Sequence, residues 1–260
     1  MELFDSHAHY NDERFDGNRE EILEKAYTEG VTSILNAGYG LESSKKAIQI
    51  AEKYPFMYAS VGISPNDLED IKVKGISILN EISHLAKHQK VVAIGEIGLD
   101  YYWNKSHSEL QKEIFIKQIK IANEVDLPII IHTREAVSDT IDILRNKIQC
   151  ENKGVFHCCP LNRELVKEAL KLDYYISFAG PVTFKNVKNA DDIIGMVPLE
   201  KMLVETDSPY LSPEPFRGKR NDSRNVKYVA EKIAKVRGIS IEEIADITYK
   251  NAEKIFRINN

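Results

Sequence analysis

Eight short apolar segments recur along this chain and alternate with stretches of helical periodicity. The segments are rich in Val, Ile, Tyr and Phe, and most are nearly continuous rather than interrupted by polar residues. Strands buried on both faces of a parallel sheet have this pattern. The alternation therefore predicts a parallel α/β fold. The predicted strands cover residues 2–4, 31–38, 57–63, 91–98, 128–132, 154–158, 174–180 and 202–207.

Two of the intervening stretches carry signals for the start of a helix. Ser106 followed by Glu109 has the spacing of a capping box and predicts a helix over 106–126. Ser240 and Glu243 repeat that spacing before the last apolar-periodic stretch. This final helix comes after the eighth strand–helix pair and is an addition to the repeat.

The arrangement of polar residues favours a closed barrel over an open sheet. An open doubly wound sheet usually has a Gly-rich turn after its first strand, whereas this chain has SHAHYND there. Polar residues instead follow many of the predicted strands, and a barrel gathers all eight strand ends in one mouth. We therefore expect one (β/α)8 TIM-barrel domain over residues 1–260, with an additional C-terminal helix.

Charge and cysteine content restrict the setting of the protein. The net charge is −5, whereas a protein that coats duplex DNA nonspecifically is usually basic, so any nucleic-acid contact should be local to a site. Three cysteines, two of them adjacent, make a poor disulfide framework. No signal peptide or membrane span is evident. We expect a cytoplasmic protein that needs no membrane and no obligatory protein partner.

Six metal-ligating side chains fall at the ends of five predicted strands. A single buried histidine is usually a hydrogen-bonded core residue. Four imidazoles and two carboxylates in one barrel mouth, however, would be electrostatically costly without a cation. The predicted ligands are His7, His9, Glu96, His132, His157 and Asp207.

Six ligands are too many for one tetrahedral ion that keeps an open position. They suit two divalent ions, with His7, His9 and Asp207 on one ion, His132 and His157 on the other, and Glu96 as the bridge. Such a pair activates water for hydrolysis. The imidazoles favour Zn²⁺ or Mn²⁺, with Mg²⁺ able to occupy the weaker site.

Two acidic residues in VETD have further predicted roles. We expect Asp207 to take a proton from the attacking water and pass it to the leaving group. Glu205 lies two residues earlier and either orients a ligand or water, or is a paired carboxylate of the barrel interior.

Long motifs resemble the TatD family of metal-dependent deoxyribonucleases, which belongs to the amidohydrolase-like superfamily. The resemblance rests on DSHAH, VVAIGEIGLDYYW, IIIHTREA, ISFAGPVTF and LVETDSPYLSPEPFRGKRN, and it spans almost the whole chain. It implies hydrolysis of DNA phosphodiesters, often by 3′–5′ exonuclease action on single strands. It also implies the same six metal ligands.

The chain departs from the family pattern at two places. Ser64 in VGISPND replaces the usual His, which in the family is expected near the substrate phosphate. Cys159 and Pro160 in HCCPLN replace residues of the usual HCF-S/T-G motif. We expect these changes to alter catalysis or one pocket wall and to leave the metal ligands untouched.

Candidate substrate contacts surround the predicted metal site. Arg217, Lys219 and Arg220 lie in the loop after strand eight and could clamp phosphates, as could Arg134 after His132. Trp103 is the candidate for stacking on an unpaired base.

Other functions are compatible with part of this pattern. The same barrel mouth could serve an amide or lactone hydrolase, or a hydrolase of small phosphoesters. A carboxylated Lys often bridges the metals in amide hydrolases of the superfamily, so Glu96 favours the nuclease branch. A metal-bound adaptor without catalysis would not need the complete ligand set.

Overall fold

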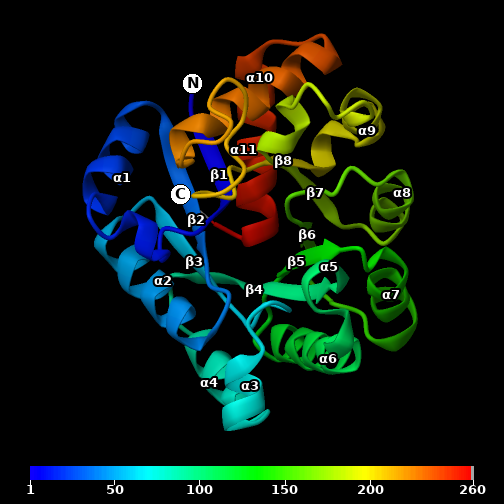
Figure 1. Ribbon diagram of the computed structural model, residues 1–260. Helices are drawn as coiled ribbons and strands as arrows, with labels where there is room; N and C mark the ends of the chain where they lie inside the picture. The colour runs from blue at the N-terminus through cyan, green and yellow to red at the C-terminus, as the bar shows by residue number, and fades with distance from the viewer. Residues whose placement is uncertain (259–260) are drawn as a thin grey trace.

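The computed structural model describes residues 1–258, apart from the side chain of Asn104, and contains the predicted barrel. Eight parallel strands are hydrogen-bonded in chain order, and helices surround them (Figure 1). The strands are β1 (Leu3–Ala8), β2 (Val31–Ala37), β3 (Met57–Val61), β4 (Val91–Asp100), β5 (Ile129–Arg134), β6 (Gly154–Phe156), β7 (Tyr175–Phe178) and β8 (Met202–Val204).

Most helices follow the strand–helix alternation expected of a barrel. Within the described residues they are α1 (Arg19–Thr28), α2 (Leu41–Lys53), α3 (Glu69–Lys74), α4 (Ile78–Leu85), α5 (Tyr101–Asn104), α6 (Ser108–Glu124), α7 (Val137–Asp142), α8 (Arg163–Lys171), α9 (Ala190–Met196), α10 (Val226–Arg237) and α11 (Ile241–Phe256). None of them is both long and apolar enough to cross a lipid bilayer.

One helix start was predicted wrongly and the other correctly. Ser106 lies in a short 3-10 turn (Lys105–His107), and α6 begins two residues later with His107 at its N-cap position. The loop after β4 thus makes two short turns before α6 can begin. The Ser240–Glu243 capping box is present at α11, where the hydroxyl of Ser240 accepts from the backbone N–H of Glu243 at 3.2 Å.

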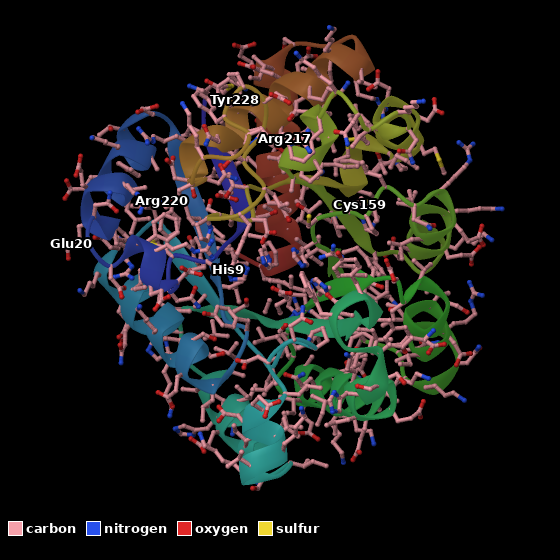
Figure 2. All side chains as sticks on the ribbon, in the orientation of Figure 1. His9, Glu20, Cys159, Arg217, Arg220 and Tyr228 are labelled. Atoms are coloured by element: carbon pink, nitrogen blue, oxygen red, sulfur yellow. The ribbon has the colours of Figure 1, made fainter. Side chains whose placement is uncertain are left out.

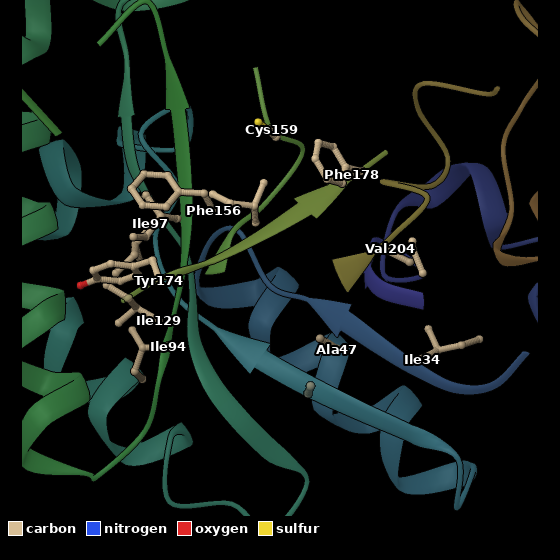
Figure 3. Packing of buried hydrophobic residues seen from close by; sticks show 14 of the residues in the cluster. Ile34, Ala47, Ile94, Ile97, Ile129, Phe156, Cys159, Tyr174, Phe178 and Val204 are labelled. Carbon is tan, nitrogen blue, oxygen red and sulfur yellow. The ribbon is translucent and has the colours of Figure 1, made fainter. Parts of the chain in front are cut away.

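The strands have apolar side chains on both faces because both faces are buried. Ile34, Ile94 and Ile129 belong to the larger core cluster, which also includes side chains of the surrounding helices (Figure 3). Phe4 and Ile130 belong to a second cluster inside the barrel. The nearly continuous apolar runs of the sequence reflect this double burial.

The additional helix α11 closes the end of the barrel away from the ligand-bearing strand ends. Its Phe256 packs in the same cluster as Phe4, and the side-chain amide of Asn251 donates to the carbonyls of Leu199 and Met202 at 2.8 and 2.9 Å. These contacts lie at the beginnings of the strands. The other end of the barrel is therefore left open for a site.

Hydrogen bonds between the first and last strands join the two edges of the sheet beside the predicted ligands. The backbone N–H of Asp207 donates to the carbonyl of His7 at 2.9 Å. The backbone N–H of His9 donates to the carbonyl of Ser208 at 2.7 Å. Buried Asp5 accepts from both the backbone and the hydroxyl of Thr206 at 2.8 and 2.6 Å. The ligand-bearing ends of β1 and β8 are thereby held side by side.

Candidate metal centre

All six predicted ligands meet at the mouth of the barrel. His7, Glu96 and His132 lie within strands, whereas His9, His157 and Asp207 follow the ends of β1, β6 and β8. His9 is labelled near the centre of the mouth in Figure 2. Because every strand of the barrel ends in this region, residues up to 200 positions apart in sequence come into contact here.

Four donor atoms form one compact group on the β1 side. Nε2 of His7 lies 3.1 Å from Nε2 of His9, and both nitrogens lie 3.5 Å from Oε2 of Glu96. Oδ1 of Asp207 is 3.7 Å from Nε2 of His7 and 3.4 Å from Nε2 of His9. Ligands bound at roughly 2.0–2.2 Å around a tetrahedral ion are separated by about 3.4 Å, so this group has the spacing of a metal site.

The other oxygen of Glu96 faces a second group. Oε1 of Glu96 lies 3.0 Å from Nδ1 of His132 and 3.6 Å from Nε2 of His157. The two imidazole nitrogens are 3.2 Å apart. One carboxylate therefore presents one oxygen to each pair of histidines, which is the arrangement expected of a bridging ligand.

Hydrogen bonds fix which nitrogen of His9 and His132 faces the centre. Nδ1 of His9 lies 3.0 Å from the carbonyl of Ala37, which can only accept, so Nδ1 carries the proton and Nε2 presents its lone pair. Nε2 of His132 likewise donates to Oδ2 of Asp100 at 2.9 Å, so in the neutral imidazole, which is the form that binds a metal, Nδ1 presents its lone pair towards the centre. Metal-bound histidines are usually oriented by such partners.

Glu205 performs the same task for His157. Its Oε1 lies 3.3 Å from Nδ1 of His157 and accepts from the backbone N–H of Cys158 at 2.7 Å. The carboxylate is completely buried. Glu205 is thus a paired carboxylate of the barrel interior that contacts His157 and does not line the cavity.

Sequence reasoning missed Asp100 and its neighbour Asn66. Oδ2 of Asp100 accepts from the amide of Asn66 at 3.0 Å, and Oδ1 accepts from the backbone N–H groups of Tyr102 and Trp103 at 3.0 and 3.1 Å. Asp100 is four residues after Glu96 in the same strand, and this even spacing was a usable signal for a shared face. No signal in the sequence pointed to Asn66.

The charges of the site compensate one another. Burial opposes ionisation of Glu96, but the charge of His157 and hydrogen bonds from the surrounding imidazoles hold its pKa well below the usual value. Burial likewise opposes protonation of His157, yet Glu96 and Glu205 raise the pKa of its imidazole well above normal. A proton on His157 thus partly replaces a cation, and metal binding must displace it.

A cavity of about 860 Å³ is lined by five of the six candidate ligands, all except the fully buried His7. Ser64, Trp103 and Arg134 line it, as do Cys159 and Pro160, so both departures from the family pattern lie on its wall. The guanidinium of Arg134 lies 3.8 Å from the centre of the Tyr102 ring. Trp103 is 68 % exposed and is available to a ligand.

The structure separates the basic residues that were predicted as one phosphate clamp. Arg220 points towards α1, where its guanidinium donates to the carbonyl of Arg14 and, at 3.1 Å, to the side chain of Asn18. Arg217 points the other way and donates to Asn186 at 3.2 Å. Figure 2 shows the two arginines well apart. Neither they nor Lys219 line the cavity.

Comparisons with known proteins agree with this site. The family model described as TatD related DNase matches residues 4–257. The chain is 45 % identical to an uncharacterized metal-dependent hydrolase of Bacillus subtilis over 99 % of this chain and 100 % of that protein. It is 37 % identical to another such hydrolase of Escherichia coli K12, over 100 % of this chain and 97 % of that protein.

A solved structure extends the likeness to the fold. The crystal structure of the TatD homologue YjjV from Escherichia coli superposes with a TM-score of 0.92 at 28 % identity, covering 99 % of this chain and 98 % of that one. Sequence and fold thus lead to one conclusion: the chain belongs to the TatD family and is a metal-dependent hydrolase.

Proposed function

We propose that this hydrolase cleaves DNA phosphodiester bonds at the ends of single strands, with two divalent cations in its barrel mouth. The observation that carries the proposal is the position of Glu96, whose two oxygens face two separate pairs of histidines. Paired ions of this kind are a recurrent device for in-line displacement at phosphorus. The cleavage polarity, 3′ to 5′, is carried over from the family resemblance.

The donor chemistry supports transition metals as the cations. His7, His9 and Asp207 would hold one ion, His132 and His157 the other, with Glu96 shared. Imidazole-rich sites suit Zn²⁺ or Mn²⁺ better than Mg²⁺, which prefers oxygen ligands. When bound, such ions lower the pKa of water and stabilise the negative charge that develops on phosphate oxygens.

Two features of Asp207 support a role for its carboxylate in moving the proton. Its backbone φ of 56° is uncommon for a residue with a side chain, and its carboxylate lines the cavity. Burial opposes its ionisation, but the hydrogen bond from His9 and the nearby imidazole charges lower its pKa. The carboxylate can therefore accept a proton from the attacking water and return it to the leaving oxygen as the P–O bond breaks.

The size of the cavity supports a strand end as substrate. A volume of about 860 Å³ lies within the range of small-molecule pockets, roughly 300–1,000 Å³. Such a space is large enough to receive a terminal nucleotide. Arg134, on the wall beside His132, supports recognition of a phosphate.

The proposal can be tested with a panel of substrates and metals. End-labelled single-stranded DNA, duplex DNA, RNA, a simple phosphodiester, a lactone and an amide should be compared with Zn²⁺, Mn²⁺ and Mg²⁺, with and without EDTA. We expect stepwise, EDTA-sensitive shortening of single-stranded DNA. Efficient hydrolysis of the lactone or amide without any cleavage of DNA would refute the proposal and favour a carbonyl substrate.

A further inference from the structure

A group of cations lies beside the cavity on its β7–β8 side, and two of its members, Lys185 and Lys188, were not predicted from the sequence. Lys185 and Lys188 are exposed and stand on either side of Val187, which lines the cavity. Arg217 joins this segment from the loop after β8 through its hydrogen bond to Asn186. We call Lys185, Lys188, Arg217 and Lys219 the basic rim.

Contacts within the basic rim hold part of it in place before any ligand arrives. The guanidinium of Arg217 lies 4.3 Å from the centre of the Phe184 ring, and the ammonium of Lys219 lies 5.7 Å from that of Phe216. Aromatic rings attract cations over these distances without neutralising them. A guanidinium fixed in this way loses less conformational entropy when it binds an anion.

The basic rim keeps its charge available. Among residues 1–258, no carboxylate forms an ion pair with Lys185, Lys188, Arg217 or Lys219. The nearby carboxylate of Asp191 is held by Lys232. The chain as a whole carries a net charge of −5, and many of its exposed lysines are paired, for example Lys25 with Glu21. Cations without a carboxylate partner, next to a segment that lines the cavity, therefore favour an anionic partner.

We propose that the basic rim binds the phosphodiester backbone of the nucleotides that remain outside the cavity when a strand end is inserted. This inference rests on the proposed function and adds the direction in which the substrate leaves the site. The contacts are to phosphates alone, so binding at the rim should be independent of base sequence.

Salt dependence gives a quantitative expectation. For single strands, each neutralised phosphate adds about −0.7 to the slope of log affinity against log salt concentration. At about 0.1 M salt, one phosphate contact therefore raises the binding affinity about 5-fold, and two contacts raise it about 25-fold. The double variant Lys185→Gln/Lys188→Gln should weaken binding of a single-stranded oligonucleotide of about 12 nucleotides by about 25-fold and reduce the slope by about 1.4.

The experiment measures affinity by fluorescence anisotropy with the metal-loaded full chain, using a non-hydrolysable phosphorothioate oligonucleotide. The matched control is Lys235→Gln/Lys254→Gln, which removes two exposed lysines near the C-terminal ends of α10 and α11. We expect the control to bind within twofold of the wild type. Equal losses in both variants, or no loss in the rim variant, would overturn the inference.

A second measurement separates this inference from the proposed function. Hydrolysis of bis(p-nitrophenyl) phosphate reports on the cavity alone, because this diester is too short to reach beyond it. A loss as large on this diester as on the oligonucleotide would contradict a role for the rim. The wild type could bind the oligonucleotide more tightly than the rim variant and yet cleave no DNA under any condition. That result would support the basic rim as a binding site and refute the proposed function.

Discussion

Asp100 offers the sharpest test of how the metal centre is organised. Its Oδ2 accepts from Nε2 of His132 and from the amide of Asn66, and its Oδ1 accepts from two backbone N–H groups. In Asp100→Asn, one of these oxygens becomes an NH₂ group that faces donors. If the NH₂ group faces His132, the imidazole must move its proton to Nδ1 and accept at Nε2, so Nδ1 can no longer bind a metal. If it faces Tyr102 and Trp103, it meets their two backbone N–H donors instead.

The expected magnitude follows from this loss of orientation. Removing a hydrogen-bond partner of a metal-bound histidine typically lowers metal affinity 10–100-fold, which corresponds to about 1.4–2.7 kcal/mol. The effect should fall on the binding step that involves His132 and leave the step involving His7 and His9 unchanged. Calorimetric titration of the metal-free protein with Zn²⁺, and competition with a chromophoric chelator, can measure both steps.

A matched control is available on the same side of the barrel. Asp139 accepts from the hydroxyl of Tyr101 at 2.6 Å and pairs with Lys112, but contacts no histidine of the site. Asp139→Asn should therefore bind metal as the wild type does. Two unaltered binding steps in a folded Asp100→Asn protein would refute the orienting role, and circular dichroism establishes that it is folded.

Three further changes test the site and the fold. Glu96→Ala removes the carboxylate shared by both histidine pairs, so the purified protein should contain neither metal, by elemental analysis, nor hydrolytic activity; normal turnover would exclude Glu96 as the bridge. Asn251→Ala leaves the carbonyls of Leu199 and Met202 without their donor, and urea unfolding should show about 2 kcal/mol lower stability with unchanged metal content. The hydrogen bond from Arg14 lowers the pKa of Asp12 to about 2. The ionised Asp12 carboxylate therefore stabilises the fold above about pH 4, and this stabilisation is lost as the pH falls towards 2. Because Arg14 is nearly half exposed, Asp12→Asn should lower stability by only about 1 kcal/mol at pH 7. If Asp12→Asn lowered stability by the same amount at about pH 2.5, the pairing of Asp12 with Arg14 would not be the cause.

The sequence predicted the fold, and the meeting of the six candidate ligands at its mouth, for the same physical reason. Strands buried on both faces need long apolar runs, so their positions and ends are visible in the chain. The carboxyl ends of parallel strands share one edge of the barrel. Polar residues at those ends, such as His7, Glu96 and His132, are therefore brought together by any sequence that folds this way.

The sequence predicted the structure of the loops between these elements less well. Ser106 and Glu109 have the spacing of a capping box, yet the chain turns twice after β4 and α6 begins beyond Ser106. Arg217 and Arg220 are three residues apart, but Gly218 adopts a φ of 86° between them and the two side chains point to opposite sides of the mouth. Closeness in sequence did not mean closeness in space.

The tertiary structure alone decided which groups support the metal ligands. The carbonyl of Ala37 fixes the proton of His9, and Asn66 meets Asp100 across 34 positions. A backbone carbonyl has no signature in a sequence, and the amide of Asn66 becomes a partner only when its loop meets the end of β4. The sequence by itself thus determined the barrel and the set of candidate ligands at its mouth. The orientation of each imidazole and the position of the basic rim depend on how separate loops pack.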